Sequence, residues 1–337
     1  MRYFLIFFLL VISFIRVTGQ ETEKKTTYVP SPDTASIFYT QINDRWPGEK
    51  LTRLNDSILT GFQYFLPTEH ETSLNALTGN AGLAYHSMVF DATPEYSGFR
   101  YTPFDYIDYK WINHKIRYFQ TTGPYSNLFY STGPGKEQLF NVTHSQNIAG
   151  GLTLGIDVMI VNSLGLYERQ KSDNVSFAGT AQFISKKENY VVLGNYHNSR
   201  FRWRENGGVS KLSLFTNNVE TDRSRIPIYL KNADNLQKES GFQIRQFYYF
   251  GKLKDNPVTD SLISDTIGPK KLHRYYDPYR SNFIRHTISY SQNADSYKDP
   301  SPNSGYYDRI LIDSTKTMDS LYYQELLNDV SFEAGVG

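Results

Sequence analysis

A strict alternation of apolar and polar side chains is the feature that most constrains the fold of this chain. It is clearest in the segment 152–164, LTLGIDVMIVNSL. The aliphatic side chains occupy every second position: Leu152, Leu154, Ile156, Val158 and Ile160. An α-helix would scatter these side chains around its circumference, whereas a β-strand places all of them on one face. The segment is therefore predicted to be a strand with one wholly apolar face.

Four further segments of similar length have β-rich or alternating patterns: 174–184, 190–197, 242–250 and 283–291. Each is close to the roughly 9–11 residues with which a tilted strand crosses a bilayer. The links at 149–151 and 185–188 are short enough for tight hairpins, whereas 199–240 is long, polar and charged.

Loop lengths indicate the orientation of such strands. In a bacterial barrel the short turns face the periplasm and the long loops face the exterior. This rule assigns 149–151 and 185–188 to the periplasmic side, and 165–173 and 199–240 to the exterior. The link 251–282 is an exception, because it is long although it falls on the periplasmic side.

Composition agrees with a membrane barrel. A mean hydropathy of −0.50 excludes a bundle of membrane helices but not a barrel, in which only alternate residues face lipid. The absence of cysteine excludes disulfides and thiolate metal sites. Backbone groups in lipid must all be paired, which only helices and closed barrels achieve. The predicted fold is all-β: an antiparallel transmembrane β-barrel over residues 115–337, with about eight or nine strands present.

The N-terminal region has three predicted parts. Residues 1–19 combine a basic start, the apolar run YFLIFFLLVISFI and small residues before Gln20, which is typical of a secretory signal peptide. Residues 20–36 are polar and without period, and we interpret them as a periplasmic tether. Residues 37–114 fit neither helix nor strand well and are predicted to be irregular.

The motifs do not support an enzyme. The segment Gly133-Pro-Gly-Lys136 has the outline of a phosphate loop, but Tyr130 replaces the first glycine and Glu137 the magnesium-binding hydroxyl. We predict a hairpin turn there. The histidines lack the spacing of metal ligands, and we interpret His144 and His197 as polar surface residues. The G-x-S-x-G motif of serine hydrolases is absent. Basic and acidic residues number 35 and 34 and are scattered, which argues against a nucleic-acid groove. We expect no catalytic residues, no metal and no cofactor.

Three charged residues on the polar faces of the strands are candidates for lining a pore: Asp157, Arg245 and Arg285. In a barrel they would project into the lumen and set its electrostatic preference. The alternative is that these charges pair with each other and only maintain the shape of the barrel.

Several ordered blocks of the sequence resemble a known family. They include Lys136-Glu-Gln138, Phe140-Asn-Val142, His144-Ser-Gln-Asn147 and Leu154-Gly-Ile-Asp157, followed by Asn162-Ser-Leu-Gly-Leu-Tyr167 with Arg169-Gln170. The stretch GNAGLAYHS at 79–87 and the tyrosine-rich segments near 302–307 and 319–323 extend the likeness. Together these blocks look like the putative porins of Bacteroidetes-type bacteria.

This resemblance implies an outer-membrane porin for passive diffusion of small hydrophilic solutes. The implied partners are outer-membrane lipid, the barrel-assembly machinery, small hydrophilic solutes and, for a homo-oligomer, further copies of the chain. Barrels of this kind usually close with a terminal aromatic residue, whereas this sequence stops at Gly337 within a strand pattern. We therefore expect the sequence to be the N-terminal part of a longer protein.

Two other functions remain open at this point. An outer-membrane binding or adhesion barrel would hold a glycan or a host surface with its loop 199–240, which contains Trp203. A secreted enzyme on a soluble β-sandwich is the third reading.

Overall fold

The computed structural model describes one unit, which lies within residues 36–337. The described ranges are 37–41, 52–54, 66–69, 74–89, 107–121, 123–149, 151–186, 189–217, 220–250, 254–255, 274–275, 282–308 and 320–335. The predicted signal peptide (1–19) and tether (20–36) lie outside these ranges.

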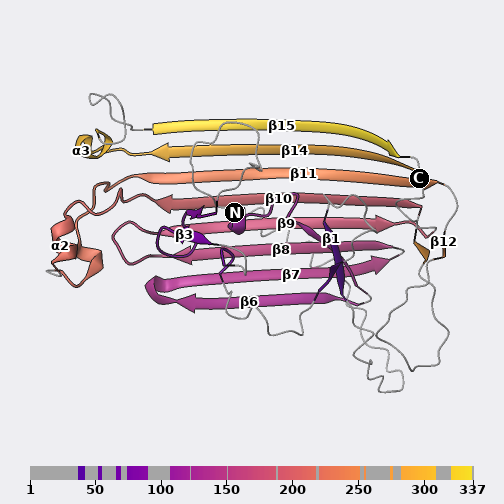
Figure 1. Ribbon diagram of the computed structural model, residues 1–337, viewed down its shortest axis with the longest axis horizontal. Helices are drawn as coiled ribbons and strands as arrows, with labels where there is room; N and C mark the ends of the chain where they lie inside the picture. The colour runs from indigo at the N-terminus through magenta and orange to yellow at the C-terminus, as the bar shows by residue number, and fades with distance from the viewer. Residues whose placement is uncertain are drawn as a thin grey trace, which may run out of the picture. The chain divides into compact units, whose positions relative to one another are not determined.

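An antiparallel sheet of eight strands dominates the fold (Figure 1). Its strands are β6 (Tyr125–Gly133), β7 (Glu137–Ala149), β8 (Leu152–Ser163), β9 (Ser172–Ile184), β10 (Tyr190–Arg204), β11 (Asp234–Phe250), β14 (Asn282–Lys298) and β15 (Ser320–Gly335). Neighbours in the sheet follow one another along the chain, so the sheet is a meander, and it is not closed. The all-β, antiparallel, barrel-like architecture predicted from the sequence is confirmed.

The remaining elements are short. In the N-terminal region β1 (Phe38–Gln41) pairs with β2 (Thr52–Arg53) and β5 (Arg117–Gln120), and β3 (Asn75–Leu77) pairs with β4 (Tyr85–Ser87). Later in the chain β12 (Lys254–Asp255) pairs with β13 (Arg274–Tyr275). The described helical turns are η2 (Ile107–Tyr109), η3 (Pro134–Lys136), α2 (Leu212–Thr216), η4 (Arg223–Arg225) and α3 (Ser304–Tyr307). Across the ranges given above, no helix has the length and apolar character needed to cross a membrane.

The glycine-rich segment before Lys136 is a turn, as predicted. The turn η3 joins β6 to β7, which pair through Gly133 and Glu137. Gly135 has a φ of 67°, and a Cβ at this position would lie 3.1 Å from the carbonyl oxygen of Gly165. A phosphate loop would lead into a helix, whereas this segment leads into a strand.

The strands extend beyond the segments that the alternation identified. β10 and β11 remain paired from Trp203–Asn235 to Arg204–Asp234, so the connecting loop is 205–233 and not 199–240. The backbone ladder continues there, although charged residues on one face obscure the apolar period. At the N-terminal side, β5 pairs with β1, and the large sheet begins only at Tyr125.

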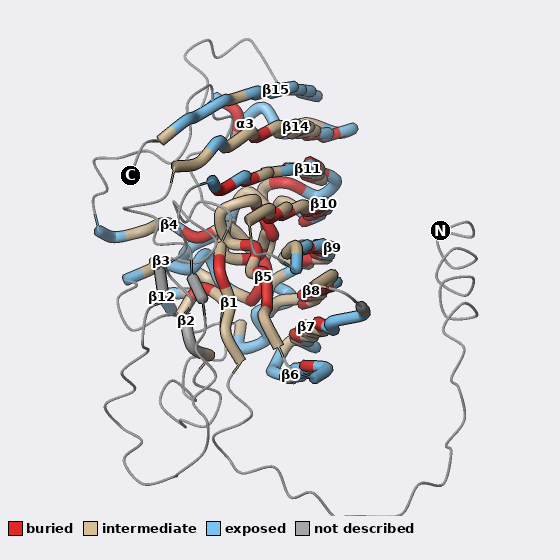
Figure 2. Tube along the Cα trace, turned by 90° about the vertical axis from the view of Figure 1, so that its right-hand side faces the viewer, coloured by how far each residue is buried: buried red, intermediate tan, exposed pale blue. Residues whose placement is uncertain are grey.

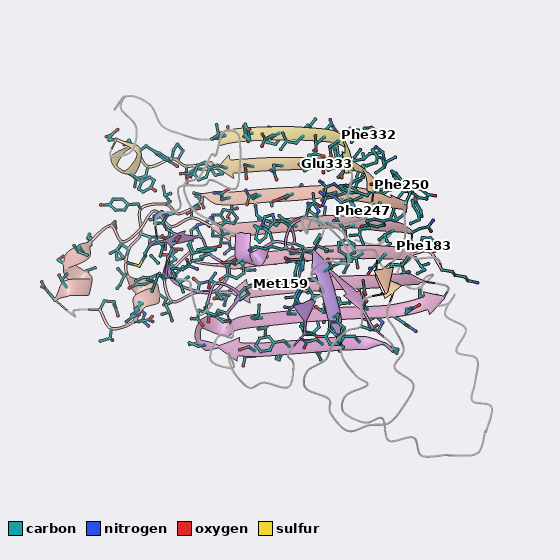
Figure 3. The ribbon with its side chains drawn as sticks, turned by 45° about the vertical axis from the view of Figure 1, so that its right-hand side comes forward. Met159, Phe183, Phe247, Phe250, Phe332 and Glu333 are labelled. Atoms are coloured by element: carbon teal, nitrogen blue, oxygen red, sulfur yellow. The ribbon has the colours of Figure 1, made fainter. Side chains whose placement is uncertain are left out.

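Buried and more exposed residues alternate along the central strands of the sheet, which Figure 2 colours by burial, so its two faces differ. We define the inner face as the one that carries Asp157, and the outer face as the one that carries Leu154. On β8, Asp157 is 2% exposed whereas Leu154 is 39% exposed. The side chains labelled in Figure 3 alternate in the same way: by register Phe183, Phe250 and Phe332 belong to the outer face, and Met159, Phe247 and Glu333 to the inner face. The predicted one-sided strand is confirmed.

Aromatic residues on the outer face form two rows. The row nearer the long loops contains Tyr196, Phe242 and Tyr290, which are register partners on three adjacent strands, with Phe177 beside Tyr196 at 6.5 Å between ring centroids. The opposite row contains Phe183, Tyr190, Tyr248, Phe250 and Phe332. The rows are six residue steps apart on β9 and β10 and eight between Phe242 and Phe250 on β11, which is roughly 20 to 26 Å at about 3.3 Å per residue.

Candidate functional site

The inner face of the sheet is the candidate functional site, and all three predicted pore-lining residues lie on it. Asp157 on β8 accepts a hydrogen bond from the Thr143 hydroxyl at 2.6 Å. On β11 the Nε of Arg245 donates to the Thr287 hydroxyl at 3.1 Å.

Arg285 on β14 forms an ion pair with Glu333 on β15. The structure brings Arg285 close to Arg245, because Thr287 is the register partner of Arg245 on the adjacent strand. Asp157 is three strands away from Arg245, about 14 Å across the sheet, and its register row meets β11 at Gly241, roughly 13 Å along that strand from Arg245. The three residues therefore belong to one surface but not to one cluster.

The N-terminal region covers much of this inner face. We call its described residues 74–89 and 107–121 the inner segment. At the loop end of β9, Ser172 Oγ donates to the Ala81 carbonyl at 2.7 Å and Asn174 Nδ2 donates to the Gly82 carbonyl at 2.5 Å. These bonds join residues that are 91 and 92 positions apart in the chain.

Further contacts follow the same strand toward its other end. The Trp111 amide donates to Ser176 Oγ at 2.9 Å, and Asn195 Nδ2 donates to the Tyr118 hydroxyl at 3.0 Å. Asn195 is the register partner of Thr180 on β9. The contacts thus extend from the level of residue 172 to that of residue 180, roughly 26 Å along the strand. The inner segment lies lengthwise on the inner face.

An ion pair fixes the middle of the inner segment. Lys110 Nζ lies 2.9 Å from a carboxylate oxygen of Glu239 on β11, and the two side chains are only 11% and 10% exposed. The same ammonium group lies 5.6 Å from the ring centroid of Phe201 on β10. A pair this buried costs much more to break than an exposed one, because one charge is left without its partner in a poorly solvated place.

Apolar side chains also hold the inner segment against the sheet. Ala81, Tyr85, Ile116 and Tyr118 belong to one buried cluster with sheet residues such as Val161. The other sheet members include Leu139, Met159, Leu193, Phe201, Trp203 and Phe247. Burial raises the pKa of the Tyr109 and Tyr118 hydroxyl groups, so both remain neutral at physiological pH. An inner face that met only water would not carry these apolar residues.

Several buried polar atoms at this interface have no protein partner among the described residues. They are Trp111 Nε1, the Gln182 side-chain amide, His197 Nδ1 and Gln243 Oε1. Buried polar groups of this kind are normally satisfied by ordered water. The sequence reading of His197 as a surface residue is wrong: it is 1% exposed and faces Gly241, where a Cβ would lie 2.8 Å from the His197 ring.

The inner faces of β14 and β15 are less buried than those of the central strands (Figure 2). By register they carry Asp295, Glu325 and Asp329 in addition to the Arg285–Glu333 pair. Sequence reasoning missed these acidic residues as a group. Glu325, Asp329 and Glu333 recur at even spacing and hence share one strand face, which was the available signal.

The long loops fold against each other. Tyr297 and Tyr307 are joined through their hydroxyl groups at 2.5 Å and pack with Leu230 and Ala233. Trp203, which the adhesion hypothesis placed in a loop, instead belongs to β10 and is 4% exposed. Its Nε1 donates to Glu205 at 2.6 Å, and burial raises the pKa of that carboxyl group.

Comparison with protein families identifies the chain. A family model described as "Putative porin" matches residues 38–335. The chain belongs to this porin family. No curated protein and no solved structure matches it. The match covers the inner segment as well as the sheet, so in this porin-family chain both belong to the family domain.

Proposed function

We propose that this porin-family protein is an outer-membrane pore through which small hydrophilic solutes diffuse passively, and that the inner segment must move before they pass. The observation that carries the proposal is the two-faced sheet. Its outer face is mainly apolar between two aromatic rows, and its inner face carries polar and charged side chains together with the apolar residues that the inner segment covers.

The outer face supports a membrane location. Transmembrane barrels have an apolar band about 25 Å tall, flanked by aromatic residues at both interfaces. The two rows are roughly 20 to 26 Å apart along the strands that carry both, somewhat less after allowance for strand tilt. Because unpaired backbone groups are not tolerated in lipid, the edge strands β6 and β15 each require a partner in the membrane. Export would use the signal peptide predicted over 1–19.

The inner segment supports a gated passage. Its hydrogen bonds cover the inner face from the level of Asn235 to that of Gln243 on β11, that is, from the loop end to the aromatic row through Phe242, where an open pore would hold water. Its contacts combine the apolar cluster around Ile116 and Tyr118 with a buried ion pair, single hydrogen bonds and incompletely satisfied polar groups. Water satisfies such groups when the contact opens, so release costs less than separation of a wholly apolar core. Asp157, Arg245 and Arg285 would then face the solute.

Single-channel recording in a planar bilayer tests the proposed pore. We expect discrete conductance steps from the full-length protein, with long closed intervals while the inner segment is docked. A protein that inserts into the bilayer and shows no steps at any voltage, even when the inner segment is released as described in the Discussion, would refute the pore.

Replacement of Val192 by arginine tests the lipid-facing assignment. Val192 is an outer-face residue of β10 whose register partner, Gln246, is halfway between Phe242 and Phe250. A charge at the bilayer midplane destabilises a barrel by roughly 2–4 kcal/mol. Folding into lipid vesicles, titrated with guanidinium, measures this loss. The matched control is Asn198→Arg on the outer face beyond the aromatic row, for which we expect about 0–1 kcal/mol. Equal losses for both variants would contradict the assignment.

A further inference from the structure

The outer face carries a group of basic side chains immediately beyond the aromatic row that lies nearer the long loops. On β10, Arg200 follows Tyr196 by four positions, and on β11, Lys238 precedes Phe242 by four positions. Arg200 and Lys238 are register partners on adjacent strands, and both are exposed. They form the centre of what we call the basic patch.

The level of the basic patch relative to the apolar band follows from the sheet register. Val175 on β9 is the register partner of Arg200, and Ile160 on β8 is the partner of Val175. Val175 is an outer-face residue that is 41% exposed. Across the sheet from β8 to β11, one register row therefore contains Ile160, Val175, Arg200 and Lys238 in that order. On β10 and β11 the apolar surface ends at Tyr196 and Phe242, four positions before the patch, while β8 and β9 are still apolar at the level of the patch. This is the level of lipid headgroups if the proposed membrane location is correct.

Neither Arg200 nor Lys238 has an acidic residue directly opposite it, and Asp173, the carboxylate diagonal to Arg200, is directly opposite Arg202. Across the strands they face Val175 and Ala294, which carry no charge. No carboxylate forms an ion pair with either of them within the part of the chain that the structure describes. One level higher, Arg202 differs, because it lies 3.7 Å from Asp234, which also accepts a hydrogen bond from Arg169.

The basic patch continues above this level with Arg204 and Lys298, which are both exposed register partners of Asp234. Basic side chains therefore exceed acidic ones on this part of the outer face. Their long aliphatic stems reach along apolar surface while the charged ends remain in the polar layer. A phosphate group suits such a cluster, because guanidinium groups bind it through two parallel hydrogen bonds and ammonium groups bind it as point charges.

We propose that the basic patch binds the phosphate groups of a phosphorylated lipid headgroup in the outer leaflet. The inference rests on the proposed membrane location, because a lipid reaches this surface only if the outer face is in the bilayer. Arg200 and Lys238 are the central contacts, and Arg204 and Lys298 extend the surface away from the bilayer centre. Each basic residue near a charged membrane surface strengthens binding by about fivefold.

The experiment compares the full-length protein with Arg200→Gln/Lys238→Gln. Both are inserted into phosphatidylcholine vesicles that contain either lipid A or its dephosphorylated form, and the lipid that remains bound after gentle extraction is counted by native mass spectrometry. We expect the wild type to prefer the phosphorylated lipid and the variant to bind it about 25-fold more weakly. Lys186→Gln/Lys211→Gln is the matched control, since both lysines are exposed, Lys186 in the turn after β9 at the opposite end of the sheet and Lys211 seven residues beyond Arg204 in the loop.

The outcomes separate this inference from the proposed function. A wild-type protein that inserts but binds both lipids equally overturns the inference and leaves the pore intact, as does an unchanged preference in the Arg200→Gln/Lys238→Gln variant. A wild-type protein that does not insert into vesicles overturns both. The substituted side chains are exposed, so the variant is expected to fold, which heat-modified electrophoretic mobility verifies.

Discussion

A disulfide between positions 82 and 172 is expected to hold the pore closed until it is reduced. Gly82 belongs to the inner segment and Ser172 to β9, and a Cβ at position 82 would lie 3.0 Å from Ser172 Oγ. This separation suits a disulfide in the Gly82→Cys/Ser172→Cys variant. The chain contains no other cysteine that could compete. Oxidised protein should show almost no conductance in planar bilayers, and a reductant should restore the openings of the wild type.

Two controls distinguish closure of the pore by the 82–172 disulfide from damage to the protein. The Gly82→Cys variant alone carries the backbone strain of a side chain at a φ of 79° but cannot form the bond. The Ser291→Cys/Leu327→Cys pair cross-links β14 to β15, whose register partners these residues are, and leaves the inner segment free. Neither control should respond to oxidation. If the 82–172 disulfide forms and conductance does not change, the gate is refuted but the pore is not.

Charge reversal at the Lys110–Glu239 pair is expected to open the pore. In Lys110→Glu a carboxylate would face Glu239, and in Glu239→Lys an ammonium group would face Lys110, in both cases at a site that is about 10% exposed. Loss of a partner in a buried pair costs roughly 3–5 kcal/mol. Most of this cost would fall on the docked state, so the ratio of open to closed time should rise by about a hundredfold or more.

The double variant Lys110→Glu/Glu239→Lys is the control that isolates the pair. It restores opposite charges and should return the open fraction most of the way to that of the wild type. We expect the return to be incomplete, because Asp295 also interacts with Lys110 and would face a carboxylate in its place. Single variants that gate like the wild type would show that the pair does not hold the inner segment. If the double variant has the same open fraction as the single variants, the effect comes from disturbed folding and not from loss of the ion pair.

Local pattern explains how much of the fold could be predicted. The alternation around Ile156 identified β8, its apolar face and its neighbours, because the side-chain period of a strand is a property of the strand itself. The pattern weakened at Arg200 and Arg202, where both faces carry long or polar side chains, and there the prediction ended a strand that the structure continues to Arg204. Backbone pairing does not require an apolar face, so the hydrogen-bonded pairing of the strands continues beyond the point where the apolar–polar alternation ends.

The candidate site was only partly visible in the sequence. Asp157, Arg245 and Arg285 were placed on the polar faces of their strands, and the structure puts all three on the inner face. The residues that fix the inner segment were not foreseen, among them Lys110 and Glu239. Nothing within 37–114 repeats with the period of a strand or a helix. The contact of the inner segment with the inner face of the sheet therefore could not be inferred from the sequence pattern.

The sequence by itself determined that this protein forms long antiparallel strands with one apolar and one polar face. Only the tertiary structure decided what lies against the polar face. Contacts such as Asn174 with Gly82 join residues 92 positions apart, and a serine or asparagine on a strand is equally compatible with water or with a backbone carbonyl as its partner. Which of the two it meets depends on the path of the chain in three dimensions, and that path placed the inner segment across the candidate passage.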